Sequence, residues 1–141
     1  MECEVLVVED LDADRVLVLD ALNAIGLGQE TRCFRTGGEA MDYLAALETR
    51  HDEARVPLLL VLDLILPQVS GWEVLEWLEQ RVWFAPMLRV VLSKLDDNAS
   101  MQRAYGLGAH AFLCKGALQH NATTLTRIFH GYWLFAQRVG S

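Results

Sequence analysis

The stretch Leu58-Leu59-Leu60-Val61-Leu62-Asp63-Leu64-Ile65-Leu66-Pro67 decides the fold of this chain. Its first five residues form a continuous apolar run, which is typical of a strand buried on both faces of a parallel sheet. An aspartate follows directly, and Pro67 and Gly71 then mark a loop. The pattern predicts a strand of an α/β protein, with Asp63 at the carboxyl edge of the sheet.

Apolar runs alternate with amphipathic stretches on both sides of this segment. Further strands are predicted at residues 5–8, 29–34, 87–92 and 109–113. Apolar residues at helical spacing predict a first helix that is capped by Asp12 or Asp14 and ends at Gly26. Further helices are predicted over residues 36–47, after Gly71, and over 97–106 and 118–138. Five βα units of this regularity predict a five-stranded, doubly wound parallel sheet of the α/β class.

Length, composition and charge exclude several classes of function. With 141 residues and 52% hydrophobic residues, the chain is expected to form one globular domain over residues 1–141. A net charge of −7 argues against nucleic-acid binding, which needs a basic face. Cys3, Cys33 and Cys114 are scattered without a metal or disulfide pattern, and no apolar run is long enough to span a bilayer. We therefore expect a cytoplasmic protein that binds neither nucleic acid nor a membrane.

Polar residues follow four of the five predicted strands. Glu9-Asp10 ends the first strand, Asp63 the third, Ser93-Lys94 the fourth and Lys115 the fifth. Because parallel strands end at the same edge of a sheet, we expect these residues to lie close together.

This set of residues suits phosphoryl transfer. Converging carboxylates repel one another unless a cation neutralises them, and oxygen ligands favour Mg²⁺. A carboxylate held against Mg²⁺ can act as the nucleophile and form an aspartyl phosphate. Lys115 can supply a positive charge opposite the metal, and the Ser93 hydroxyl can donate to a phosphoryl oxygen.

These residues resemble the receiver domains of two-component response regulators over nearly the whole chain. Four segments carry the resemblance, namely Val7-Val8-Glu9-Asp10, Val61-Leu62-Asp63-Leu64-Ile65-Leu66-Pro67 through Gly71, Val91-Leu92-Ser93, and Phe112-Leu113-Cys114-Lys115. The resemblance implies a flavodoxin-like, CheY-like fold. It also implies that Asp63 accepts a phosphoryl group from a sensor histidine kinase and that the chain signals through a conformational or oligomeric switch.

The same resemblance assigns roles to individual residues. The implied Mg²⁺ contacts are Glu9, Asp10, Asp63 and the backbone carbonyl of Ile65. Ser93 and Phe112 stand at switch positions, where the hydroxyl moves onto the phosphate and the aromatic ring turns inward. Such a domain catalyses only its own phosphorylation and dephosphorylation, so we do not expect an enzyme with other substrates.

The segment after the fifth strand departs from the usual family pattern. The family commonly has a proline after the lysine, joined through a cis bond, whereas Gly116 follows Lys115 here. A cis bond without proline costs about 3–4 kcal/mol, so either strain is kept or this loop is built differently. Residues 115–118, Lys-Gly-Ala-Leu, and the aromatic last helix are similar to response regulators paired with bacterial phytochrome kinases. We expect a single-domain regulator without an output domain after Ser141.

The last predicted helix carries more apolar residues than its core face needs. The core stripe comprises Leu125, Ile128, Phe129, Tyr132, Ala136 and Val139. Trp133 and Leu134 fall off this stripe. We therefore predict a homodimer that uses the side formed by the fourth helix, the fifth strand and the last helix.

Two other functions could use similar residues. Phosphatases of the haloacid-dehalogenase type also use a strand-end aspartate with Mg²⁺, but they need a second carboxylate two positions later, where this chain has Ile65. A docking module without phosphorylation chemistry is the second alternative, and the complete acidic pocket with Ser93 and Lys115 argues against it.

Ile65 and Leu95 also bear on the lifetime of a phosphoryl group. They lie two positions past Asp63 and Ser93 and flank the expected path of an attacking water. Since neither side chain can hydrogen-bond to water, we expect a slowly decaying phosphoryl state.

Overall fold

A computed structural model describes residues 5–118 and 122–140 of the chain. Its strands are β1 (Val5–Val8), β2 (Thr31–Phe34), β3 (Leu59–Leu62), β4 (Leu88–Ser93) and β5 (Ala111–Cys114). They form one sheet in the order β2-β1-β3-β4-β5, and every adjacent pair is parallel. This order confirms the predicted doubly wound sheet. The chain moves outward from β1 to β2 and then crosses back to β3, so the strand order reverses between β1 and β3.

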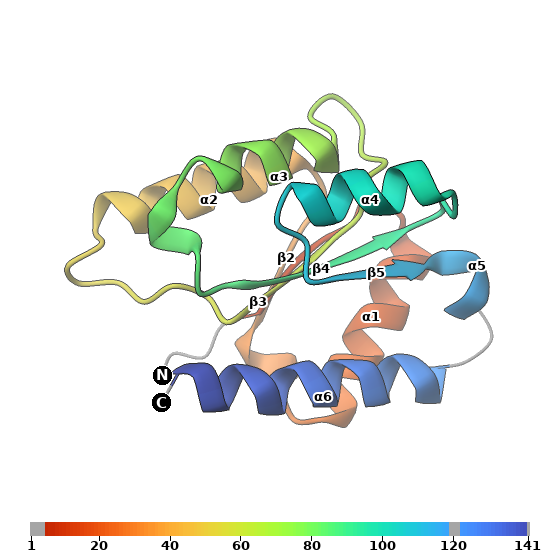
Figure 1. Ribbon diagram of the computed structural model, residues 1–141. Coiled ribbons are helices and arrows are strands. Elements are labelled where there is room, and N and C mark those ends of the chain that lie inside the picture. Colours follow the sequence, from red (N-terminus) through yellow and green to blue (C-terminus); the bar gives the residue numbers. More distant parts are fainter. Residues whose placement is uncertain (1–4, 119–121, 141) are drawn as a thin grey trace.

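Helices cover both faces of this sheet (Figure 1). The α-helices are α1 (Asp12–Ala24), α2 (Gly37–Thr49), α3 (Gly71–Glu79), α4 (Asn98–Gly106), α5 (Lys115–Leu118) and α6 (Ala122–Gly140), with 3-10 turns η1 (Gly28–Glu30) and η2 (Val82–Phe84). In Figure 1, α2, α3 and α4 lie on one side of the sheet, and α1 and α6 lie on the other. Within residues 5–118 and 122–140, no helix combines the length and the apolar character needed to cross a bilayer.

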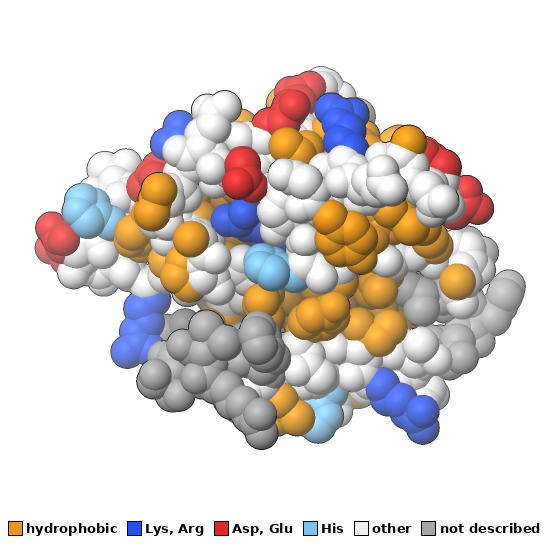
Figure 2. All heavy atoms as spheres, viewed as in Figure 1, with side chains coloured by type: hydrophobic (Ala, Val, Ile, Leu, Met, Phe, Trp, Pro, Cys, Tyr) orange, Lys and Arg blue, Asp and Glu red, His pale blue; other side chains and the backbone are white. Residues whose placement is uncertain are grey.

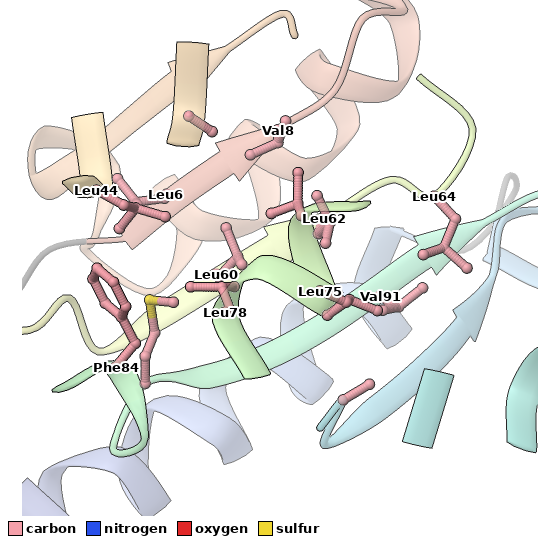
Figure 3. Packing of buried hydrophobic residues seen from close by; sticks show 14 of the residues in the cluster. Leu6, Val8, Leu44, Leu60, Leu62, Leu64, Leu75, Leu78, Phe84 and Val91 are labelled. Atoms are coloured by element: carbon pink, nitrogen blue, oxygen red, sulfur yellow. The ribbon is translucent and has the colours of Figure 1, made fainter. Parts of the chain in front are cut away.

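The hydrophobic core consists of one layer on each face of the sheet. Figure 3 shows the layer toward α2 and α3, in which Leu6, Leu60 and Leu62 of the strands pack with Leu44 and Leu75 of the helices. The opposite layer joins Val5, Val7, Leu59 and Val61 of the strands to Val18 and Leu22 of α1 and to Leu125 and Phe129 of α6. Every residue of β1, β3 and β4 is buried, as expected for central strands of a parallel sheet.

The starts of α2, α3 and α4 follow local capping chemistry, whereas that of α1 does not. The Thr36 hydroxyl accepts a hydrogen bond from the Glu39 backbone N–H at 3.1 Å and begins α2 at the predicted place. The first helix is different, because Leu11 precedes it without a side-chain cap. Asp12 and Asp14 lie inside its first turn, so the expectation that one of them caps the helix is wrong.

Several predicted bounds also differ from the structure; the fifth strand, for example, begins at Ala111 and not at residue 109. The second strand begins at Thr31 and not at residue 29, because residues 28–30 form η1. The predicted last helix is preceded by the separate short helix α5, which starts at Lys115. The peptide bond between Lys115 and Gly116 is trans. With glycine in place of the family's proline, this loop is therefore built differently and keeps no cis bond.

The core stripe of α6 is confirmed only in part. Leu125 and Phe129 are fully buried, and Ile128 and Tyr132 pack against the same layer. Trp133 was expected off the stripe, but it also packs against this layer, so that expectation is wrong. The side chains of Ala136 and Val139 lie outside the part of the chain whose side chains are described.

Candidate functional site

The carboxyl ends of four strands bring the predicted polar residues to one edge of the sheet. Glu9 follows β1 and Asp63 follows β3, with exposed fractions of 2% and 3%. Ser93 is the last residue of β4 and is fully buried. Lys115 follows β5 and is 5% exposed. The site therefore lies where the strand order reverses, which is the usual place of function in this architecture.

Backbone hydrogen bonds fix the two central carboxylates. The Asp63 N–H donates to the Val8 carbonyl at 3.0 Å, which extends the pairing of β1 and β3 by one residue. Its Oδ1 accepts from the Ile65 N–H at 3.0 Å. Glu9 Oε2 accepts from the Leu11 N–H at 3.2 Å. Each carboxylate is thus held by its own loop in a defined orientation.

Lys115 joins three carboxylates from different parts of the chain. Its Nζ lies 2.7 Å from Glu9 Oε1, 2.8 Å from Asp14 Oδ2 and 2.9 Å from Asp63 Oδ2. An ammonium group has three protons, so each can face one carboxylate. Asp14 was not among the predicted site residues. Its only sequence signal was a place in the first turn of α1, which most often marks an exposed acid near the helix dipole.

Burial and charge set the protonation of this cluster. Burial raises the pKa of the Glu9 carboxyl to about 7; the Lys115 ammonium opposes this rise, and the neighbouring Asp63 carboxylate adds to it. Burial alone would lower the pKa of Lys115, but its contacts with Asp14, Glu9 and Asp63 raise it above the usual value. Lys115 is therefore charged, and the crowded carboxylates would gain from a further cation.

The acidic group fits a divalent cation. One carboxylate oxygen from each of Glu9, Asp10 and Asp63 lies within 4.8 Å of the others. Asp10 Oδ1 is buried and has no hydrogen-bond partner among the described residues. A pocket of about 160 Å³ opens beside these groups, lined by Asp10, Leu11, Asp63, Ile65 and Lys94. An oxygen-only donor set with an orphaned oxygen and open space suits Mg²⁺, which keeps several waters.

The two residues expected to switch lie in adjacent strands. Ser93 Oγ accepts a hydrogen bond from the Leu95 N–H at 3.2 Å. Phe112 is half-buried in β5 and packs against the core layer toward α2, α3 and α4. In the β4–β5 register Phe112 pairs with Val91, two residues before Ser93. A change at the Ser93 hydroxyl can therefore reach Phe112 through one strand pair.

A doubly wound sheet with an acid pair, a buried aspartate, a hydroxyl and a lysine at its strand ends is the arrangement expected of a receiver-type α/β signalling domain. The chain belongs to the response regulator receiver domain family, whose sequence model matches residues 5–126.

Similar proteins cover most of the chain. The probable methanogenesis regulatory protein FilR2 of Methanothrix harundinacea (strain 6Ac) is 30% identical over 132 residues, covering 92% of this chain and 83% of FilR2. Response regulator Rcp1 of Synechocystis sp. (strain ATCC 27184 / PCC 6803 / Kazusa) is 28% identical, covering 92% of this chain and 88% of Rcp1.

The solved structures agree with this family. The phosphorylated cyanobacterial phytochrome response regulator RcpA matches with a TM-score of 0.73 and 29% identity, over 93% of this chain and 91% of RcpA. The Mn²⁺-bound form of Rcp1 matches with a TM-score of 0.70 and 29% identity, over 90% of this chain and 88% of Rcp1.

Proposed function

We propose that this chain is a single-domain response regulator that accepts a phosphoryl group from a sensor histidine kinase onto Asp63, in a reaction that needs Mg²⁺. The observation that carries the proposal is the contact of Lys115 Nζ with Asp63 Oδ2, at 2.9 Å, beside the acidic group of Glu9 and Asp10. A buried nucleophilic carboxylate with a cation on one side and a metal-type donor set on the other suits an aspartyl phosphate.

The proposed reaction exchanges one bond to phosphorus for another. A carboxylate oxygen of Asp63 attacks the phosphorus of a phosphohistidine, and the phosphorus–nitrogen bond breaks. The electron pair of that bond passes to the ring nitrogen, which takes up a proton. Attack by water on the aspartyl phosphate later releases inorganic phosphate and restores the Asp63 carboxylate. The chain thus catalyses only its own phosphorylation and dephosphorylation.

The residues around Asp63 have complementary roles in this proposal. Glu9, Asp10, Asp63 and the backbone carbonyl of Ile65 would hold Mg²⁺, which supplies neutralisation of the carboxylate and phosphoryl charges. Lys115 donates from its ammonium group to one phosphoryl oxygen. Ser93 donates from its hydroxyl to another, and Phe112 turns inward in response.

The kinase is proposed from the similar proteins and from the sequence after β5. RcpA is a phytochrome response regulator, and Mn²⁺ occupies one form of Rcp1. The segment Lys115–Leu118 of this chain forms α5 directly after the site. We therefore propose a bacterial phytochrome-type kinase as the partner, with both proteins acting in the cytoplasm.

An apolar groove between β5 and α6 supports a proposed homodimer. Figure 2 shows hydrophobic side chains gathered between α4 and α6, over the exposed edge of the sheet. A groove of about 600 Å³ on this side is lined by Leu88, His110, Leu113, Arg127, Ile128, Gly131 and Tyr132. Tyr105 of α4 and Leu134 of α6 are 50% and 49% exposed. An apolar surface of this kind suits a second copy of the chain.

The test of the proposed function is intact-protein mass spectrometry after incubation with acetyl phosphate. We expect one phosphoryl adduct with Mg²⁺, none after chelation of the metal, and none in an Asp63→Asn variant. An adduct that persists in Asp63→Asn would place the acceptor elsewhere. No adduct on the wild-type protein, either from acetyl phosphate or from phytochrome-type kinases, would favour a docking module without this chemistry.

A further inference from the structure

We propose that Asp14 is a positioning residue that holds the Lys115 ammonium beside Asp63 while Mg²⁺ occupies the carboxylates of the pocket. This inference rests on the proposed Mg²⁺-dependent phosphorylation and names a further residue on which that chemistry depends.

The contact between Asp14 and Lys115 joins distant parts of the chain. Asp14 Oδ2 lies 2.8 Å from Lys115 Nζ, although 101 positions separate the two residues. The Asp14 side chain is 14% exposed and that of Lys115 is 5% exposed. The start of α1 and the start of α5 lie at the same end of the sheet (Figure 1). The ion pair between Asp14 and Lys115 joins them.

Asp14 differs from the other two partners of Lys115 in one respect. Glu9 and Asp63 belong to the group of carboxylates that lie close enough together to share a metal ion, and Asp14 does not. A divalent cation in the pocket would compete with the Lys115 ammonium for the carboxylates of Glu9 and Asp63. It would also repel the ammonium directly. Asp14 lies outside the group of carboxylates that could share the metal ion. Its carboxylate therefore continues to pair with Lys115 and offsets this repulsion.

An ordinary helix-terminal role does not account for Asp14. Acidic residues in a first turn stabilise a helix through its dipole and are usually exposed. Asp12, in the same turn, fits that description, because its side chain is 74% exposed and pairs with Arg15 and Arg35. Asp14 is instead directed into the site. The structure thus offers two aspartates in one turn, only one of which contacts the proposed machinery.

The test compares Asp14→Asn with Asp12→Asn by calorimetric titration of Mg²⁺ into the unphosphorylated protein. Both variants remove one negative charge from the same turn of α1. We expect Asp14→Asn to weaken Mg²⁺ binding by about fivefold, because Lys115 then competes for Glu9 and Asp63 and is repelled by the metal. Asp12→Asn should stay within about twofold of wild type, since an exposed charge is screened. Asp14→Glu keeps the carboxylate and should also stay within about twofold.

A second titration in a Lys115→Met background separates action through Lys115 from a plain charge effect. We expect Asp14→Asn to have clearly less effect on Mg²⁺ binding there, because the residue through which Asp14 acts is gone. An equal effect in both backgrounds would overturn the inference, as would an Asp14→Asn variant that behaves like Asp12→Asn or an Asp14→Glu variant as weak as Asp14→Asn. A wild-type chain that binds no Mg²⁺ would overturn the proposed function and this inference with it. Wild-type binding with no difference between the two aspartates would overturn the inference alone.

Discussion

Ile65 is one of the residues that line the pocket beside Asp63. Its side chain is 51% exposed and lines the pocket together with Lys94. Leu95, two positions past Ser93, is half-buried against the core layer toward α2, α3 and α4. A water molecule that approaches the phosphoryl group past Ile65 and Leu95 finds no hydrogen-bonding partner in either of these two side chains.

We predict that Ile65→Asn shortens the lifetime of the phosphorylated protein, because an amide can bind and orient the attacking water. The loss of phosphoryl group should be at least about threefold faster than in the parent protein. Decay is followed by intact-protein mass spectrometry after acetyl phosphate is removed, and Ile65→Val serves as the apolar control. Equal decay of Ile65→Asn and the parent would show that this position does not limit access of water.

His110 is fixed by a backbone contact that depends on its protonation. Its Nδ1 accepts a hydrogen bond from the Arg89 N–H at 3.0 Å, so this nitrogen must be unprotonated. Burial, and then the positive charge of Arg89, lower the pKa of His110 below its ordinary value of 6.5. The folded state therefore binds a proton less readily than the unfolded state does. The contribution of the neutral His110 side chain to the free energy of unfolding is fully present above pH 6.5 and is lost as the pH falls through the lowered pKa.

This sign gives a prediction for the free energy of unfolding. When the pH is lowered from about 7.5 to about 5.5, the free energy of unfolding measured with urea should fall less in His110→Asn than in the parent protein. The Asn Oδ1 can accept the same Arg89 N–H but does not titrate, so only the pH dependence should change. His110→Leu removes the acceptor as well and should be less stable at both pH values. An unchanged pH dependence in His110→Asn would show that this histidine does not titrate differently on folding.

At the scale of elements, the loop between β3 and α3 is shaped by a close approach of two backbone segments. The Gly71 N–H donates to the Leu64 carbonyl at 2.9 Å. A Cβ added at Gly71 would lie 2.2 Å from the Asp63 carbonyl oxygen and 2.6 Å from Leu64 Cα. Both neighbours are backbone atoms, which cannot rotate away. The loop that carries Asp63 can therefore close on α3 only with glycine at this position.

We predict that Gly71→Ala lowers the free energy of unfolding by about 2–4 kcal/mol, because the loop must move to admit the methyl group. The same movement displaces the backbone of Asp63, so phosphorylation by acetyl phosphate should also slow. The control is Gly106→Ala in α4, where an added Cβ meets no atom within 4 Å. Urea unfolding should place the control within about 1 kcal/mol of the parent. Two variants of equal stability would contradict the steric argument.

The elements that could be predicted from the sequence are those in which the pattern of apolar and polar residues directly reflects burial. β1 and β3 are continuous apolar runs because both faces are buried, and the site residues Glu9, Asp63 and Lys115 follow directly from the strand ends. By contrast, β2 is an edge strand with exposed residues in its middle, and its predicted start was too early. Asp14 was missed because its direction depends on a contact with Lys115 that no local pattern encodes. Tertiary packing decides such positions.

At the scale of the whole molecule, β4 and β5 contribute both to the site and to the apolar groove. The candidate site lies at the carboxyl ends of the strands, and the groove is lined by Leu88 at the amino end of β4, by Leu113 of β5 and by residues of α6. Ser93 lies in β4 and Phe112 in β5, where Phe112 pairs with Val91, two residues before Ser93. Leu113, the neighbour of Phe112 in β5, lines the groove, so a movement of this strand together with Phe112 would alter the groove. We propose that phosphorylation and dimer formation are coupled through these two strands.

The dimer itself gives the last prediction. Leu134 follows Arg127 and Gly131 of the groove at helical spacing, and its side chain is 49% exposed. A charge there should weaken association, because burying it in an apolar contact is unfavourable. We expect the parent protein to sediment as a concentration-dependent dimer and Leu134→Glu to raise the dissociation constant by at least about tenfold. Val82→Glu is the matched control, since Val82 lies in η2 and is 87% exposed, and it should stay within about twofold of the parent. If both variants sediment like the parent, or if the parent stays monomeric at high concentration in both the phosphorylated and the unphosphorylated state, the groove is not a dimer surface.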